Sequence, residues 1–289
     1  MGQNFDKKLL KALGFSNKLN RKKLSSWRNS VDRIVHPRHS VDIGIVGKYT
    51  DLKDSYASVK EALVHAGAYL ETNVKIHWIE SADLEKEGTG RLLNGLNGIL
   101  VPGGFGNRGI EGMINGIAHA RKEHLPYLGL CLGMQLMAVE YARNAAGMKN
   151  ANSSEFDNKT KYDIIHLLPS QEDVKSKGGT MRLGLWKCKL SKDSISRKLY
   201  GKAVVGERHR HRYEFNNKYR SALERRGLTI AGTTTDGKLV EFIEWKDSFG
   251  IATQSHPELR SRLESPAPLF IGFVEAALTE KKSQRKNSA

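Results

Sequence analysis

The chain has little cysteine: Cys131 and Cys188 are the only two in 289 residues. Two cysteines are too few for a disulfide-stapled secreted scaffold, and such a low number is typical of a reducing compartment, so we expect a cytoplasmic protein. The sequence also lacks an apolar run of bilayer length and a hydrophobic N-terminal signal segment. These absences argue against a membrane-spanning or a secreted protein.

Asp and Glu are fewer than Lys and Arg, 31 against 47, and the formal net charge is +16. Residues 1–40 contribute +8 and residues 280–289 contribute +3, which leaves +5 for residues 41–279. Charge concentrated at chain ends usually belongs to solvated segments, so we do not expect a nucleic-acid partner. We expect a basic linker over residues 1–40, one domain with a sizeable core over residues 41–279, and a basic tail over residues 280–289.

Apolar segments alternate with helical patterns along the central domain. Strands are expected at residues 41–48, 74–79, 98–101, 127–130, 239–245 and 250–254. The first helix is expected to begin at Asp54 or Ser55 as N-cap and to bury one face made of Tyr56, Val59, Leu63 and Ala66. Further helices are expected at residues 110–123, from Cys131 to about residue 145, and at residues 269–278. This alternation predicts an α/β fold with a mostly parallel, twisted sheet flanked by helices.

Residues 128–135 read Leu-Gly-Leu-Cys-Leu-Gly-Met-Gln, which is an apolar strand running into Cys131 and a helical pattern leaving it. A sharp strand-to-helix turn holds its central residue exposed and strained, and the flanking Gly129 and Gly133 allow other backbone to come close. The helix N-terminus behind the sulfur favours the reactive thiolate. The pattern therefore indicates a nucleophile, with a buried structural cysteine as the alternative.

Residues 252–258 read Ala-Thr-Gln-Ser-His-Pro-Glu and place His256 at the end of a predicted strand. A cysteine nucleophile needs a base, and the base needs a third group that orients it. Glu258 is close enough in sequence to turn back onto the imidazole of His256. Taken alone, such a triplet is most often a surface turn, but together with Cys131 it predicts a catalytic triad.

Residues 98–106 form an apolar strand that ends in the glycine-rich turn Pro-Gly-Gly-Phe-Gly. Backbone N–H groups in such a turn can stabilise a developing negative charge. The alternatives are a phosphate cradle, which would normally carry the Lys-Ser/Thr of a P-loop, and a plain tight turn. We favour an oxyanion hole, in which the backbone N–H groups of this turn stabilise the developing negative charge.

These three motifs, in this order, resemble those of the triad-type (class I) glutamine amidotransferases, whose fold is flavodoxin-like. Within that family the sequence is most similar to the glutaminase domain of CTP synthases, and the resemblance extends over residues 41–279. It rests on residues 47–49, 52–56, 102–106, 108–112, 150–156, 178–184 and 207–214.

The resemblance implies a role for each site residue. Cys131 would attack glutamine and form a thioester, His256 would act as base, and Glu258 would orient it. Backbone amides of Gly104 and Leu132 would form the oxyanion hole. The implied glutamine-binding residues are Gly104, Leu132, Gly133, Met134, Gln135, Glu155 and Arg212, with Glu155 on the α-ammonium and Arg212 on the α-carboxylate. An anion and a cation held apart suit a zwitterionic amino acid.

Two of these assignments have plain alternatives. Glu155 alone could be a solvated loop carboxylate. The alternating Arg and His of residues 208–212, followed by aromatic residues, could be a solvated strand or a nucleic-acid patch. Alternation leaves every second side chain on one face, which suits a strand whose Arg212 points inward.

The resemblance implies L-glutamine as substrate and an amidoligase domain or subunit as partner, with possible homo-oligomerisation through that partner. ATP and Mg²⁺ would belong to the amidoligase, and neither a metal nor a cofactor is expected in this chain, which contains no P-loop. The chain begins about where the amidoligase domain of the family ends. It could be a fragment, one half of a split enzyme, or a stand-alone glutaminase.

Two residues beside the predicted base depart from the family pattern. Ser255 and Leu259 stand where aromatic residues are usual. An inactive regulatory subunit that keeps the glutaminase fold is therefore the competing hypothesis. A hydrolase of γ-glutamyl compounds or a peptidase is a third possibility, which Glu155 and Arg212 disfavour because they select a free amino acid.

Overall fold

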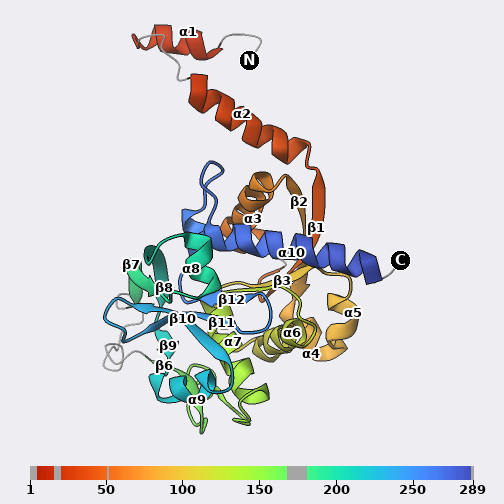
Figure 1. The fold of residues 1–289 in the computed structure, drawn as a ribbon, viewed down its shortest axis with the longest axis vertical. Helices are drawn as coiled ribbons and strands as arrows, with labels where there is room; N and C mark the ends of the chain where they lie inside the picture. The colour runs from red at the N-terminus through yellow and green to blue at the C-terminus, as the bar shows by residue number, and fades with distance from the viewer. Residues whose placement is uncertain (1–4, 16–20, 51, 168–180, 288–289) are drawn as a thin grey trace.

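A nine-stranded sheet forms the centre of the molecule (Figure 1). The computed structural model describes residues 5–15, 21–50, 52–167 and 181–287. The strand order is β2-β1-β3-β4-β12-β11-β10-β7-β8. The bounds are β1 His39–Gly47, β2 Thr72–Glu80, β3 Gly98–Val101, β4 Tyr127–Leu130, β7 Arg182–Leu190, β8 Val204–His211, β10 Leu228–Thr234, β11 Val240–Trp245 and β12 Gly250–Thr253.

The sheet has a parallel half and an antiparallel half. Strands β2, β1, β3, β4 and β12 pair in parallel, and β11, β10, β7 and β8 continue the sheet in antiparallel pairs. The parallel half has the order 2-1-3-4-5 of flavodoxin-like folds. The α/β prediction is confirmed, and the antiparallel half makes the whole sheet mixed. Strands β3, β4 and β12 are fully buried, which explains their continuous apolar sequences.

Helices cover both faces of the sheet (Figure 1). Helices α3, α8 and α10 pack on one face, and α4, α6 and α7 pack on the other. The two N-terminal helices α1 and α2 extend away from the sheet. The helix bounds are α1 Phe5–Ala12, α2 Arg21–Val35, α3 Ala57–Tyr69, α4 Ser81–Glu87, α5 Thr89–Leu93, α6 Ile110–Lys122, α7 Leu132–Asn144, α8 Ile195–Tyr200, α9 Arg220–Glu224 and α10 Pro268–Asn287.

Every predicted strand and helix is observed, with differences at some of the ends, whereas strands β7 and β10 and helices α4, α5, α8 and α9 were not predicted. Strands β3 and β4 match the prediction residue for residue, and the face predicted for the first helix, made of Tyr56, Val59, Leu63 and Ala66, is buried as expected. The cap prediction is wrong, because Asp54 and Ser55 lie in a 3₁₀ turn and α3 begins only at Ala57, after Tyr56. The last helix begins at Pro268, which is tolerated at a first helical position, and continues to Asn287.

A small second sheet supports the loops of the site. It consists of β5 Asn152–Ser153, β6 Asp163–Leu167 and β9 Tyr213–Phe215, in the order β5-β6-β9. Residues 178–180 of the family-like motif 178–184 lie outside the described residues. Along the part of the chain that is described, no helix combines the length and the apolar character needed to cross a bilayer.

Candidate active site

Three neighbouring parallel strands carry the predicted catalytic elements to one edge of the sheet. The glycine-rich turn follows β3, Cys131 follows β4, and His256 lies shortly after β12. Strand β4 pairs with both β3 and β12, so the three carboxyl ends are adjacent. The expectation that these segments meet at the carboxyl ends is confirmed.

Cys131 occupies a strained turn. Its φ of 52° and ψ of −98° are a conformation that costs a non-glycine residue roughly 1–3 kcal/mol. A Cβ on Gly133 would collide with the carbonyl oxygen of Val101, and a Cβ on Gly129 would lie 2.8 Å from the Gly133 carbonyl carbon. The glycines therefore allow the close backbone approach that the sequence indicated. The expected exposure is wrong, because Cys131 is only 3% exposed and is reached through cavities.

His256 is held between Cys131 and Glu258. Its Nδ1 lies 2.7 Å from Glu258 Oε1, which leaves Nε2 for the sulfur. Burial alone would lower the pKa of His256, but the charge and hydrogen bond of a Cys131 thiolate, together with Glu258, raise it to about 11. At neutral pH His256 is therefore favoured as an imidazolium, which can donate from Nε2 to the sulfur of Cys131.

The glycine-rich turn lies directly against this pair. A Cβ on Gly103 would be 2.9 Å from His256 Cε1 and 3.5 Å from Cys131 Cβ, so a larger residue would displace them. Gly104 in turn lies against the side chain of Leu132. Leu132 is the first residue of α7, where backbone N–H groups have no partner inside the helix. The two amides predicted for an oxyanion hole are thus on adjoining segments.

A buried lysine supports this turn. Lys48 is 1% exposed, and its Nζ donates to the carbonyl of Phe105 at 3.1 Å and to that of Gly106. Burial lowers the pKa of Lys48 to about 8, although nearby Glu155 opposes the shift. No role was expected for Lys48, although it ends the predicted strand 41–48 and belongs to the family-like motif 47–49.

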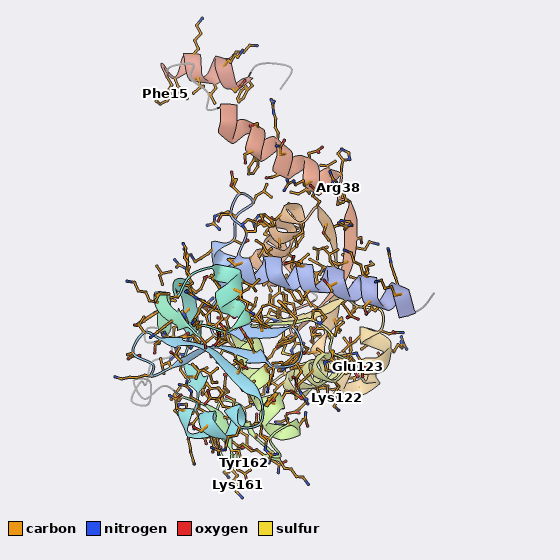
Figure 2. The ribbon with its side chains drawn as sticks, in the orientation of Figure 1. Phe15, Arg38, Lys122, Glu123, Lys161 and Tyr162 are labelled. Atoms are coloured by element: carbon orange, nitrogen blue, oxygen red, sulfur yellow. The ribbon has the colours of Figure 1, made fainter. Side chains whose placement is uncertain are left out.

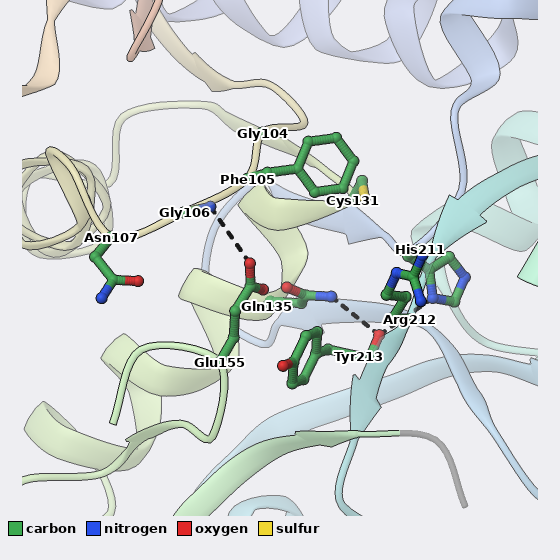
Figure 3. A pocket seen from close by; sticks show the side chains of 10 residues that line it. All are labelled: Gly104, Phe105, Gly106, Asn107, Cys131, Gln135, Glu155, His211, Arg212 and Tyr213. Carbon is green, nitrogen blue, oxygen red and sulfur yellow. Dashed lines mark hydrogen bonds between the residues drawn. The ribbon is translucent and has the colours of Figure 1, made fainter. Parts of the chain in front are cut away.

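A cavity of about 360 Å³ opens beside Cys131 (Figure 3). In this view Glu155 and Arg212 lie on opposite sides, with Gln135 between them. Glu155 accepts a hydrogen bond from the Gly106 N–H at 3.3 Å. The lining residues are Gly104, Phe105, Gly106, Asn107, Cys131, Gln135, Glu155, His211, Arg212 and Tyr213. Leu132, Gly133 and Met134 are buried in the first turn of α7 and do not line it.

A second cavity, of about 240 Å³, reaches Cys131 from the side of His256. It shares Gly104 and Phe105 with the first cavity, so the glycine-rich turn separates the two. Leu259 lines its mouth and is 41% exposed. Ser255, the other departure from the family pattern, is buried with its Oγ 2.6 Å from Thr253 Oγ1.

Arg212 reaches the first cavity by a route that the alternation did not predict. His209 and His211 face the interior from β8, whereas Arg208 and Arg210 are exposed. If β8 continued, its alternation would place Arg212 on the exposed face with Arg208 and Arg210. The strand ends at His211, however, and Arg212 lies at a bend before β9. The bend turns Arg212 toward the cavity.

Comparisons with known proteins agree with this geometry. The family model "Glutamine amidotransferase class-I" matches residues 51–276. The CTP synthase of Methanocaldococcus jannaschii is 53% identical over 265 residues, which cover 89% of this chain and 49% of that protein. The CTP synthase of Carboxydothermus hydrogenoformans is 54% identical over 260 residues, which cover 90% of this chain and 49% of that protein.

A solved structure is similar over most of the chain. The glutaminase domain of Trypanosoma brucei CTPS, solved with bound acivicin, is 36% identical with a TM-score of 0.77, and the match covers 83% of this chain and 94% of that one. The chain spans about half the length of the curated relatives it matches. It belongs to the class-I glutamine amidotransferases and is homologous to the glutaminase domain of CTP synthases.

Proposed function

We propose that this chain hydrolyses L-glutamine through a Cys131 thioester and delivers the released ammonia to an amidoligase. The observation that carries the proposal is the contact of Cys131 with a His256–Glu258 pair, at the wall of a cavity that also presents Glu155 and Arg212. A nucleophile, an oriented base and two opposite charges are what hydrolysis of a free amino-acid amide requires.

The first half-reaction forms the thioester. The thiolate attacks the amide carbon of glutamine, and the amides of Gly104 and Leu132 stabilise the resulting oxyanion. His256 gives its Nε2 proton to the departing nitrogen, the C–N bond breaks, and ammonia leaves. Glu258 holds Nδ1 and stabilises the imidazolium before that transfer.

The second half-reaction returns the site to its starting state. Neutral His256 removes a proton from water, and the oxygen attacks the thioester carbon. The C–S bond breaks, glutamate leaves, and the thiolate–imidazolium pair is restored. Throughout, Glu155 would hold the α-ammonium of the substrate and Arg212 its α-carboxylate, while Gln135 lies between them.

The larger reaction follows from the curated relatives. Because those are CTP synthases of about twice the length, we propose that the ammonia serves the ATP-dependent amination of UTP to CTP on an amidoligase domain or subunit. ATP and Mg²⁺ would bind there, and homo-oligomers would form through that partner. Both cysteines are free, which supports a reducing compartment such as the cytoplasm.

Glutamate release by the purified chain tests the proposal. Cys131→Ala is expected to lower the rate by at least about 10³-fold, because no other group can form the thioester. Cys188→Ala is the matched control: Cys188 is buried away from both cavities, burial raises its pKa, and its loss is expected to change the rate less than about 3-fold. Equal release by wild type and Cys131→Ala would remove Cys131 from the mechanism.

Trapping with diazo-oxo-norleucine separates the enzyme from an inactive regulatory subunit. This glutamine-like electrophile is expected to form one adduct, at Cys131, with Cys188 unmodified. An absent adduct in the folded wild type would support the inactive subunit instead. A panel of γ-glutamyl peptides tests the remaining alternative, and we expect free glutamine to be preferred.

A further inference from the structure

A buried polar network lies directly behind the candidate glutamine cavity, and the proposed mechanism leaves it unused. It joins the inner face of β8 to β7, β9 and β11. Each member is at most 8% exposed, and together they are Arg182, His209, His211, Glu214 and Glu241. Two of the motifs that carry the family resemblance, residues 178–184 and 207–214, supply four of the five.

The hydrogen bonds of this network have a defined direction. His211 Nδ1 lies 3.1 Å from the carbonyl oxygen of Tyr213, and a carbonyl can only accept, so Nδ1 carries the hydrogen. Burial and the charge of Arg182 lower the pKa of His211 to about 3, so the ring is neutral and its Nε2 accepts. His209 Nδ1, 2.9 Å from that Nε2, must then be a donor.

The direction continues to a carboxyl group. With its hydrogen on Nδ1, neutral His209 presents a bare Nε2 to Glu241 Oε2 at 3.5 Å. Two lone pairs would repel, so the contact is favourable only when a proton lies between them. Arg182 lies 2.6 Å from Glu241 and 3.3 Å from Glu214, and one buried guanidinium balances only one of the two carboxylates, so this pair of carboxyl groups holds one proton at neutral pH. Burial raises the pKa of both groups, that of Glu214 to about 8, and His211 Nδ1 also lies 3.4 Å from Glu214 Oε1.

The other end of the network reaches the substrate cavity. The Tyr213 carbonyl accepts a second hydrogen bond, from Gln135 Nε2 at 3.1 Å (Figure 3). The same Nε2 lies 3.2 Å from Gln254 Oε1, and Gln254 Nε2 lies 3.7 Å from Cys131 Sγ. The bond from His211 to Tyr213 also closes the bend that holds Arg212.

We propose that His209 and a protonated Glu241 are positioning residues for glutamine, acting through His211 on the carbonyl of Tyr213. That carbonyl fixes the amide of Gln135 and the bend of Arg212, so the network orients the two groups that would meet the head of the substrate. The inference rests on the proposed function, because it assigns the network to the same glutamine site.

Paired substitutions separate hydrogen bonding from bulk. Glu241→Gln keeps a donor for His209 and an acceptor for Arg182, whereas Glu241→Leu keeps neither. His211→Asn keeps a donor near the position of Nδ1, whereas His211→Leu does not. Binding is measured as protection of Cys131 by glutamine against alkylation with iodoacetamide, a reagent without an amino-acid head group. KM and kcat for glutamate release are measured alongside.

We expect each leucine variant to weaken glutamine protection and raise KM about 10-fold, as loss of one buried hydrogen bond would do. The Glu241→Gln and His211→Asn variants should stay within about 3-fold of the wild type. Glu241→Leu should change kcat, and alkylation without glutamine, less than about 3-fold, because Cys131 and His256 are untouched. Wild-type KM in both leucine variants, or an equal loss in Glu241→Gln and Glu241→Leu, would overturn the proposal.

A measurement on the wild-type protein covers the case in which a leucine variant does not fold. Nitrogen-15 NMR of the histidine rings is expected to show His209 and His211 as neutral Nδ1–H tautomers at neutral pH. An Nε2–H tautomer at His211 would reverse the direction of the network and overturn the assignment. If glutamine does not protect Cys131 in the wild type, the proposed function itself fails and the positioning role fails with it. Protection in the wild type that both leucine variants retain contradicts only the positioning role.

Discussion

Residues of one type have very different properties in this molecule because their surroundings differ. Among the histidines, His256 has its pKa raised by Cys131 and Glu258 against the effect of burial, whereas burial and Arg182 lower the pKa of His209 to about 2. The first can give a proton at neutral pH, and the second cannot. Sequence neighbours do not reveal this contrast, since Cys131 and Arg182 are distant in the chain from the histidines that they affect.

The charge of Glu258 can be tested apart from its shape. Glu258→Gln keeps an acceptor for His256 Nδ1 but removes the negative charge, so the pKa of His256 should fall and the imidazolium should become less favourable. We expect kcat for glutamate release to fall at least about 10-fold. Glu264→Gln makes the same change at an exposed position and should have no effect. Equal kcat in both variants would mean that the charge is dispensable.

We expect Lys48 to make activity depend on pH. Its depressed pKa of about 8 means that the ammonium supports the glycine-rich turn below pH 8 and loses its charge as the pH rises through that value. We expect kcat/KM to decline through about pH 8, and Lys48→Met to be about 10-fold less active at pH 7 without that decline. Lys60→Met, an exposed change on α3, should keep the wild-type profile. A decline that persists in Lys48→Met would assign it to another group.

At the scale of elements, the site depends on how closely β4 and α7 approach the strands beside them. Tyr127 donates from its Oη to the carbonyl of Gly133 at 2.8 Å, which ties the start of α7 to the strand that leads into Cys131. The first turn of this helix is buried on all sides. Small changes there should therefore act on both stability and geometry.

Gly133→Ala tests this approach. The added methyl group would collide with the Val101 carbonyl, so we expect the free energy of unfolding to fall by about 2–3 kcal/mol and glutamate release to be lost. Gly90→Ala is the matched control, because its Cβ would meet open space in the short helix α5. Thermal unfolding of both variants checks the prediction. A Gly133→Ala protein as stable and active as Gly90→Ala would contradict the proposed packing.

At the scale of the whole molecule, the two basic ends behave differently. The N-terminal segment leaves large apolar side chains exposed, among them Phe5, Phe15 and Trp27, and Figure 2 shows Phe15 far from the sheet. The end of α10 instead lies against the sheet. Lys281 pairs with Asp42 at 2.8 Å, and Gln284 bonds to Asn97 at 2.9 Å.

Truncation distinguishes the ends. Removal of residues 280–289 should lower the free energy of unfolding by about 2 kcal/mol, because the bonds to Asp42, Leu96 and Asn97 are lost. Removal of residues 1–37 should change it by less than about 1 kcal/mol and leave KM for glutamine unchanged. Helix α2 keeps its apolar residues Val31, Ile34 and Val35 exposed, and its ion pair between Arg33 and Glu71 is partly exposed. Denaturant titration compares the two, and the opposite order would show that α2 is part of the folded core.

The sequence by itself determined the α/β class, the central strands and the residues of the candidate triad, because local patterns indicate each of these. An apolar run ending in a glycine-rich turn or in Cys131 reads directly as a strand with a functional residue at its end. Only the tertiary structure decided the rest. The burial of Lys48, the inward phase of His209 and His211, and the turn of Arg212 into the cavity depend on partners far along the chain. Burial and charge act through space, and no local pattern records which carbonyl or carboxylate a side chain will meet.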